Sequence, residues 1–148
     1  DNVHYRDVVD SGTYVNSYVG GIAGYMSSGT ISNCSILGGN IRANAKKCKD
    51  SSDAHAFSGG ILGRLDGGKV TGCYRADSVE VYSYAEQDTG KNLGSAVRSA
   101  AGGIVGGGSS SSVTGCTSSS SNLTADWTVG KTTASSSYRQ TGQYVGRS

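Results

Sequence analysis

Proline is absent from this 148-residue chain, and so is any long apolar run. Proline cannot donate a hydrogen bond to a strand ladder, so its absence suits a chain that consists mostly of paired strands. No stretch approaches the roughly 18 apolar residues of a transmembrane helix, and the sequence therefore predicts no membrane span. The chain begins at Asp1 without Met or a signal peptide, which is typical of a processed mature form or of a part of a longer protein.

A strong charge of one sign is also missing. The 13 basic and 11 acidic residues leave a net charge of +2, which is too balanced for the basic surface of a nucleic-acid-binding protein. No Cys pair has CxxC spacing, and the two His residues, His4 and His55, lie far apart. Asp50 and Asp53 precede His55, but their spacing matches no ligand motif. We therefore expect no nucleic-acid partner, no metal and no cofactor.

Gly and Ser are present in excess and make up about a third of the chain, a composition also typical of disordered segments. Apolar residues nevertheless recur at fixed intervals. The motif G-G-I-x-G occurs three times, each time followed by [G/S]-x-[I/V]-[S/T]-[N/G]-C, in residues 20–34, 59–73 and 102–116. The copies begin 39 and then 43 residues apart. Because the spacing inside the motif is constant, the length variation falls between copies, as it does in stacked structural units.

The second motif predicts a short strand followed by a corner. The residue before each Cys is Asn33, Gly72 or Gly115, and Asn and Gly are the residues that best accept a left-handed backbone. The strands before these corners are residues 30–32, 69–71 and 112–114. Three columns of equivalent apolar residues are expected to point inward: Ile22, Ile61 and Ile104; Ile31, Val70 and Val113; and Ile41, Val79 or Val81, and Leu123.

These features predict an all-β fold in one domain, residues 1–148. The predicted architecture is a parallel β-solenoid (β-helix-like) of about three repeats with protruding loops. The repeats are residues 18–43, 57–83 and 100–125. An antiparallel β-sandwich is the alternative, because strands at regular spacing fit that fold as well.

The segments outside the motifs have two predicted forms. Polar loops are expected to protrude from one side of the stack at residues 44–57, 84–95 and 126–143. Partial repeats are expected at both ends of the chain, where residues 1–3 match 32–34 and residues 144–146 match 18–20.

The pattern G-G-I-x-G followed by G-x-I-S-N-C resembles the GLUG-type repeat of bacterial surface proteins. Such repeats occur in large adhesin-like proteins and in the non-catalytic parts of immunoglobulin A proteases. The resemblance covers the three motif copies and not the segments between them. It implies a tandem-repeat protein at the cell surface or in the extracellular space, whose repeats form a scaffold, and it transfers no catalytic residues.

Three of the four Cys residues, Cys34, Cys73 and Cys116, share one position of the repeat, where the expected partial copy has Val3. A position that accepts Val favours a small apolar side chain, and a free Cys behaves as one. We expect a ladder of buried thiols. A disulfide between neighbouring rungs is the alternative, although three Cys in one column cannot all pair. Cys48 lies among three lysines, which lower a thiol pKa, and is a candidate reactive or bridging thiol.

Exposed aromatic residues are the candidate binding residues. Trp127, the single Trp, and Tyr84 and Tyr138 fall in the expected loops, and aromatic rings stack on sugars and anchor protein interfaces. The alternative is that each ring packs over an edge of the solenoid. Asn122 and Asn33 begin N-glycosylation sequons, of which Asn122, beside a run of Ser, is the better acceptor.

The leading functional hypothesis is an extracellular structural or adhesive protein. It would self-associate head to tail through its solenoid ends into a fibre, or form a stalk segment. The alternative is a glycan- or protein-binding module that uses loop aromatics, with a glycan or a host surface protein as partner. Enzyme activity is not expected, because Asp66, Asp77 and Glu80 lie in the second repeat without acidic counterparts in the others.

Overall fold

The computed structural model describes residues 3–9, 14–47, 53–87, 96–108, 112–128 and 138–147, and it is all-β. These residues form 17 strands and no α-helix. The part of the chain described thus contains no helix able to cross a membrane. Every strand pair within it is parallel, so the antiparallel alternative is wrong for these residues.

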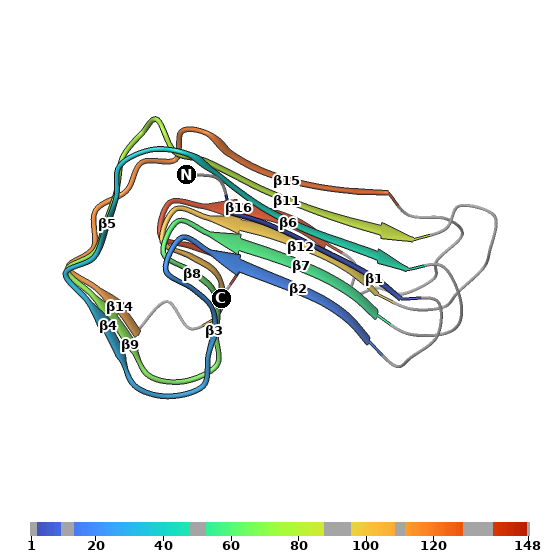
Figure 1. Cartoon of the computed structure of the whole chain (residues 1–148), viewed down its shortest axis with the longest axis horizontal. Coiled ribbons are helices and arrows are strands. Elements are labelled where there is room, and N and C mark those ends of the chain that lie inside the picture. The colour runs from blue at the N-terminus through green and yellow to red at the C-terminus, as the bar shows by residue number, and fades with distance from the viewer. Residues whose placement is uncertain are drawn as a thin grey trace.

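Two long sheets face each other and form the extended part of the molecule (Figure 1). The first sheet consists of β1 (Val3–Val9), β6 (Asn40–Lys47), β11 (Glu80–Gln87) and β15 (Leu123–Thr128). The second consists of β2 (Tyr14–Gly20), β7 (Asp53–Gly59), β12 (Val97–Gly102) and β16 (Tyr138–Gly142). Small apolar side chains fill the space between the two sheets, with Val15, Ile41, Ala54 and Val81 among the buried residues.

Three shorter sheets form the curved end of the molecule. The third sheet consists of β3 (Ala23–Met26), β8 (Leu62–Leu65), β13 (Val105–Gly108) and β17 (Val145–Arg147). The fourth consists of β4 (Thr30–Ser32), β9 (Lys69–Thr71) and β14 (Val113–Thr114), and the fifth of β5 (Ser35–Ile36) and β10 (Tyr74–Arg75). A second apolar core lies here, built around Ile61, Leu62, Val70 and Ile104.

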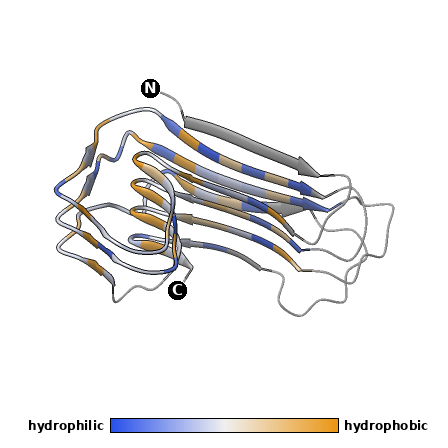
Figure 2. Ribbon diagram, turned by 60° about the horizontal axis from the view of Figure 1, so that its bottom comes forward, coloured by the Kyte–Doolittle hydropathy of each residue, from blue (hydrophilic) through white to orange (hydrophobic). Residues whose placement is uncertain are grey.

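Successive segments of the chain supply strands to these sheets in the same order. We call the segments tiers: tier 1 is β2 to β6, tier 2 is β7 to β11, and tier 3 is β12 to β15. β1 adds a strand to the first sheet beside tier 1, whereas β16 and β17 add strands to the second and third sheets beside tier 3. Figure 2 shows the strands of successive tiers lying above one another.

The motif residues of the three tiers lie beside one another, as predicted. The amide of Ile22 donates to the carbonyl of Ile61 at 3.0 Å, and the amide of Ile61 donates to the carbonyl of Ile104 at 2.9 Å. The other predicted columns are in register as well: Ile31, Val70 and Val113, and Ile41, Val81 and Leu123. The predicted parallel alignment of these motifs is therefore confirmed, with Val81 rather than Val79 beside Ile41.

The predicted corners are confirmed by the backbone. Asn33, Gly72 and Gly115 have φ angles of 53°, 60° and 61°, all in the left-handed region. A residue with a Cβ atom is strained there, and Asn is the side chain that tolerates this region best. The corner turns the chain from the fourth sheet towards the fifth in each tier.

Glycine is required where the third sheet lies directly against the second. One column of the third sheet consists of Gly24, Gly63, Gly106 and Gly146. A Cβ atom added to Gly106 would come within 2.7 Å of the Ser58 amide nitrogen, and one added to Gly63 within 2.4 Å of the Val19 amide nitrogen. Because both obstacles are backbone atoms, neither can move aside as a side chain would.

The segments expected to protrude as loops contain long strands, so that prediction is wrong for their described parts. Residues 44–47 belong to β6 and residues 53–57 to β7, and the other two segments contain parts of β11, β15 and β16 in the same way. Their inward residues are small: Ala43, Ala45, Ala54 and Ala56 are at most 1% exposed and alternate with polar residues. A prediction based on large apolar residues misses this alternation.

Both end segments occupy positions other than those predicted. Val3 pairs with Ile41 and not with the column of Cys34, so Val3 gives no information about the Cys position. The carbonyl of Tyr144 accepts the amide of Ile104 at 3.0 Å, which places Tyr144 in the Ile column and not in that of Tyr18. The ends of the described chain therefore lie in the first and third sheets.

A buried Arg joins tier 2 to tier 3. Arg75 is 0% exposed, and burial lowers its pKa. Its Nε donates to Ser118 Oγ at 3.0 Å, and its Nη2 donates to the carbonyls of Ser119 and Ser121 at 2.9 and 2.8 Å. Its Nη1 donates to the carbonyl of Val79. The guanidinium thus satisfies the carbonyls of the tier 3 corner, where regular strand pairing is interrupted.

The glycine column leads to a stability prediction. Gly106→Ala is expected to lower the free energy of unfolding by about 3 kcal/mol or more, because its methyl group meets the backbone of β8 beside it and of β7 in the second sheet. Gly38→Ala is the matched control, since no atom lies within 4 Å of a Cβ added at Gly38. That variant is expected to be neutral or slightly stabilising. Urea denaturation measures both, and equal effects would contradict the close approach of the sheets.

Candidate functional site

Four ring-bearing side chains form a continuous row across tiers 1 and 2. We call Tyr25, Tyr18, Phe57 and His55 the ring strip. The ring centroids of Tyr25 and Tyr18 are 6.2 Å apart, those of Tyr18 and Phe57 5.5 Å, and those of Phe57 and His55 5.8 Å. All three pairs are stacked, a favourable arrangement for aromatic rings.

Tyr18, Phe57 and His55 of the strip lie on the face of the second sheet that is turned away from the first, and Tyr25 belongs to β3 of the third sheet. Alternate residues of a strand point to opposite faces, and Val19, Ala54 and Ala56 belong to the core between the two sheets. Tyr18 and Phe57 therefore face the third sheet. The ring of Phe57 is covered there by the backbone of Gly107, where an added Cβ would come within 2.9 Å of the ring.

A charged pair flanks the strip on the third sheet. The Arg64 guanidinium carbon lies 5.8 Å from the Tyr18 ring centroid and 5.4 Å from that of Phe57, within the range of cation–π attraction. Arg64 Nε donates to Asp66 Oδ1 at 2.6 Å, and the Tyr25 hydroxyl donates to Asp66 Oδ2 at 3.1 Å. The hydrogen bond to Asp66 is the main cause that raises the pKa of Tyr25. Asp66 thus ties both side chains together.

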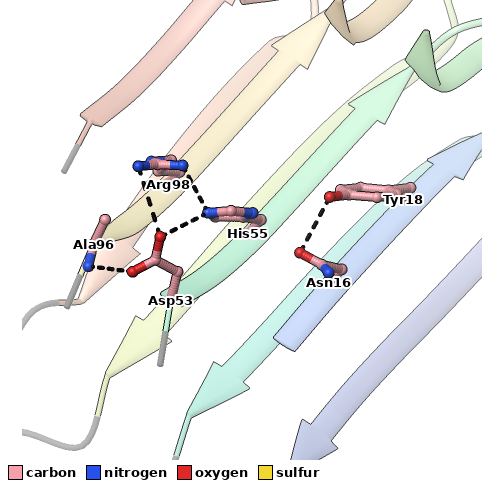
Figure 3. A network of polar contacts seen from close by, with 6 residues as sticks. All are labelled: Asn16, Tyr18, Asp53, His55, Ala96 and Arg98. Atoms are coloured by element: carbon pink, nitrogen blue, oxygen red, sulfur yellow. Dashed lines mark hydrogen bonds and ion pairs between the residues drawn. The ribbon is translucent and has the colours of Figure 1, made fainter. Parts of the chain in front are cut away.

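At its other end the strip meets a polar network, shown in Figure 3. Arg98 Nη1 donates to His55 Nε2 at 3.0 Å, and Arg98 Nη2 lies 3.6 Å from Asp53 Oδ2. Asp53 Oδ1 accepts the amide of Ala96 at 2.9 Å. Ala96 directly precedes β12 and Arg98 belongs to it, whereas Asp53 and His55 belong to β7. The network therefore joins tier 2 to tier 3.

His55 is held neutral in this network. Burial first, and then the Arg98 guanidinium, lower the pKa of His55 to about 4, although Asp53 opposes the shift. A guanidinium can only donate hydrogen bonds, so Nε2 must carry no proton when it accepts from Arg98. His55 Nε2 also lies 3.5 Å from Asp53 Oδ2, so the ring connects β7 to Arg98 of β12 and the network links the two strands.

The accessible part of this surface is aromatic and polar. Tyr25 is 51% exposed, Asn16 is exposed, and the Asn16 Oδ1 accepts the hydroxyl of Tyr18 at 3.1 Å. The side chains of Arg64 and Asp66 are 32% and 40% exposed. Such a surface offers an aromatic face together with hydrogen-bond donors and acceptors. Among the residues described, no three His, Cys, Asp or Glu side chains gather into a metal-binding group.

The three aromatic residues predicted to bind from loops belong to strands instead. Tyr84 lies in β11, Trp127 in β15, and Tyr138 begins β16. Trp127 is in register with Ala85, whereas Tyr84 is in register with Asp126, so the two occupy different columns of the first sheet. Tyr138 is in the second sheet, beside Arg98. The backbone positions of the three residues thus lie in three different columns of two sheets.

The Cys column of the motif is present as three free thiols. Cys73 is 1% exposed and Cys34 and Cys116 are partly buried against the same core. Each thiol lies 3.4 to 3.5 Å from the carbonyl oxygen two residues before it, so the three share one orientation. Burial raises the pKa of the Cys73 thiol, which lowers its reactivity. Cys48, the candidate reactive thiol, lies outside the described residues.

The two sequon asparagines lie at left-handed corners. Asn33 has φ 53° and Asn122 has φ 55°, and both are exposed. The Asn122 side-chain nitrogen donates to the carbonyl of Asp77, so the atom to which a glycan attaches is engaged in a contact between tiers.

Comparison with known proteins gives no relative: no family model, no curated protein and no solved structure matches the chain.

The ring strip was not among the predicted sites. Its sequence signal is a period of two before the G-G-I-x-G motif, in which Asn16 and Tyr18 of tier 1 correspond to His55 and Phe57 of tier 2.

The neutral state of His55 predicts a pH dependence. Its pKa is about 4 in the folded protein, against an ordinary value of 6.5. Between these pH values the unfolded chain binds more protons, so stability falls as pH falls from 6.5 to 4 and the loss levels off below. Between pH 7 and 4.5, wild type is expected to lose about 2 kcal/mol more than His55→Asn. Chemical denaturation at each pH measures this difference, and identical pH profiles would contradict the assignment.

Proposed function

We propose that this chain is a scaffold segment of an extracellular surface protein, built as a parallel β-solenoid that serves as a stalk or an adhesive array. The observation that supports the proposal most directly is the register of the tiers. Residues 39 or 43 positions apart pair across the sheets, from Ile22 to Ile61 and from Ile61 to Ile104. A stack of this kind can be extended by adding tiers, which is the property that a stalk requires.

The bonds between tiers favour a mechanical role. In the first sheet, Arg42 pairs with Glu80 at 2.9 Å and Lys46 with Glu86 at 3.0 Å, and both pairs join tier 1 to tier 2. Arg75 joins tier 2 to tier 3 from inside. These two ion pairs and the buried Arg75 each bond one tier to the next, which is what the side chains of a stalk are expected to do.

The extracellular location is proposed from the resemblance to GLUG-type surface repeats and from the polar, Ser-rich outer positions. Protease treatment of intact source cells tests it directly. Release of peptides from this chain supports the proposal, whereas protection until the cells are lysed contradicts it.

The scaffold proposal predicts that an extra tier can be inserted without breaking the fold. Gly60 and Gly103 occupy one position of the stack, because the amide of Gly60 donates to Gly102 and the amide of Gly103 to Gly142. Duplicating residues 60–102 therefore creates one new junction, between Gly102 and Gly60, which is a Gly-Gly pair like the native ones. The product is expected to unfold in one transition, with a denaturant m-value larger by about a third.

A matched control breaks the order of the strands. Duplicating residues 60–80 ends the first copy at the start of the first sheet and restarts it just before β8 of the third, so the added strands lack a strand of the second sheet. This protein is expected to be less stable than wild type. The solenoid proposal is wrong if the 60–102 duplication is as unstable as the control by circular dichroism and urea denaturation.

The second candidate function is a glycan- or protein-binding module, and the exposed part of the ring strip favours it. Tyr25 presents an aromatic ring beside Asn16, Arg64 and Asp66, which offer donors and acceptors for sugar hydroxyl groups. If this surface binds a glycan, Tyr25→Ala is expected to lower the signal on a glycan array at least about tenfold. Tyr74→Ala, at a Tyr 40% exposed in the fifth sheet, is the control and should bind normally. Equal binding by both variants contradicts a role for the strip.

A further inference from the structure

The two ends of the described stack have complementary outlines. At the tier 1 end, where β1, β2, β3 and β4 are the outermost strands described, the first sheet extends beyond tier 1 by β1 while the other sheets stop. At the tier 3 end, where β14, β15, β16 and β17 are the outermost strands described, the second and third sheets extend beyond tier 3 while the first sheet stops. Each end therefore projects where the other recedes.

At the corner between the second and third sheets, the backbone hydrogen bonds between tiers run in one direction. The amide of Ile22 donates to Ile61, that of Ile61 to Ile104, and that of Ile104 to Tyr144. Continued by one step, the same pattern makes the amide of Tyr144 a donor to a further tier. It also makes the carbonyl of Ile22 an acceptor from a preceding one. At this corner, one end thus offers a donor where the other offers an acceptor.

Apolar exposure is concentrated at the same two ends. Ile61 and Ile104 are 0% exposed, whereas Ile22 and Tyr144, in the same column at the two ends, are 49% and 44% exposed. Tyr25, at the tier 1 end of the ring strip, is 51% exposed. Since residues of one column differ in this way, their burial depends on having a tier on both sides. A neighbouring tier would remove these side chains from water.

We propose that the tier 1 end of one copy of this chain receives the tier 3 end of a second copy. β16 and β17 of one copy then pair in parallel with β2 and β3 of the next, and β15 pairs with β1. Tyr144 of one copy lies on Ile22 of the other, so the first three sheets continue unbroken through the junction. The contact joins unlike surfaces, and repeated addition gives a linear filament. This inference rests on the proposed scaffold function and names its partner as the chain itself.

Two variants block one end each. Ile22→Lys places an ammonium group at the tier 1 end, and Tyr144→Lys places one at the tier 3 end. Both positions are about half exposed in a single copy, so the variants should fold as wild type does. In the junction the charge is buried without a partner, and association is expected to weaken about 100-fold or more. Tyr74→Lys is the matched control, because Tyr74 is 40% exposed on the middle tier, and it should assemble as wild type does.

Mixing the two blocked variants separates this arrangement from other modes of self-association. Ile22→Lys keeps a native tier 3 end and Tyr144→Lys keeps a native tier 1 end. Each variant alone is expected to be monomeric by sedimentation velocity, whereas their equimolar mixture should form a dimer and nothing larger. Wild type should form filaments visible by electron microscopy at concentrations where the blocked variants do not.

Several results would overturn the proposal. A monomeric wild type at millimolar concentration, filaments of either blocked variant, or a mixture that stays monomeric would each exclude the head-to-tail junction. Dimers formed by one blocked variant alone would indicate a contact between like ends instead. Circular dichroism and the urea midpoint of the blocked variants verify that they fold. The duplication of residues 60–102 tests the scaffold separately, because it is measured on single copies and needs no junction.

Discussion

The structure depends on parallel backbone pairing in register, in which equivalent residues of neighbouring tiers exchange hydrogen bonds. Because of this constraint, each residue lies against its counterparts in the tiers above and below, and the residue types of one column must be compatible with one another. It explains the four-glycine column, Gly24, Gly63, Gly106 and Gly146, where the third sheet touches the backbone of the second. It also explains the small core residues, since two sheets packed this closely leave room for Ala and Val and for few larger side chains.

Where equivalent residues of neighbouring tiers differ in type, side-chain hydrogen bonds between the tiers supplement the backbone pairing. Arg75 stands beside Ile36 of tier 1, and its guanidinium reaches the Ser-rich corner of tier 3. His55 and Arg98 are adjacent in their column and bond to each other. Such pairs are specific to two neighbouring tiers. They therefore fix which tier follows which, a distinction that the uniform glycine and isoleucine columns cannot make by themselves.

The sequence predicts the columns whose residues are alike and misses those whose residues differ. The Ile columns and the corners at Asn33, Gly72 and Gly115 follow from identity at constant spacing, and both predictions are confirmed. The strands of residues 40–47 and 53–59 were missed because Ala and Ser on their inner face give a weak apolar signal. The positions of Val3 and Tyr144 were missed because neither resembles the residue it pairs with. The ring strip was missed because its column joins Tyr18, Phe57 and Ala100, and only the register shows that they are neighbours.

The same dependence on neighbours limits what one tier can do alone. Ile61 and Ile104 are fully buried only because strands lie on both sides of them, and the identical side chain of Ile22 is half exposed where one side is open. The free energy of burial therefore belongs to the contacts between tiers more than to the tiers themselves, as in other stacked architectures. A fold of this kind gains stability with each contact added, whether the next tier belongs to the same chain or to another. Length is then the property most readily varied, and this is the physical argument for the proposed stalk role.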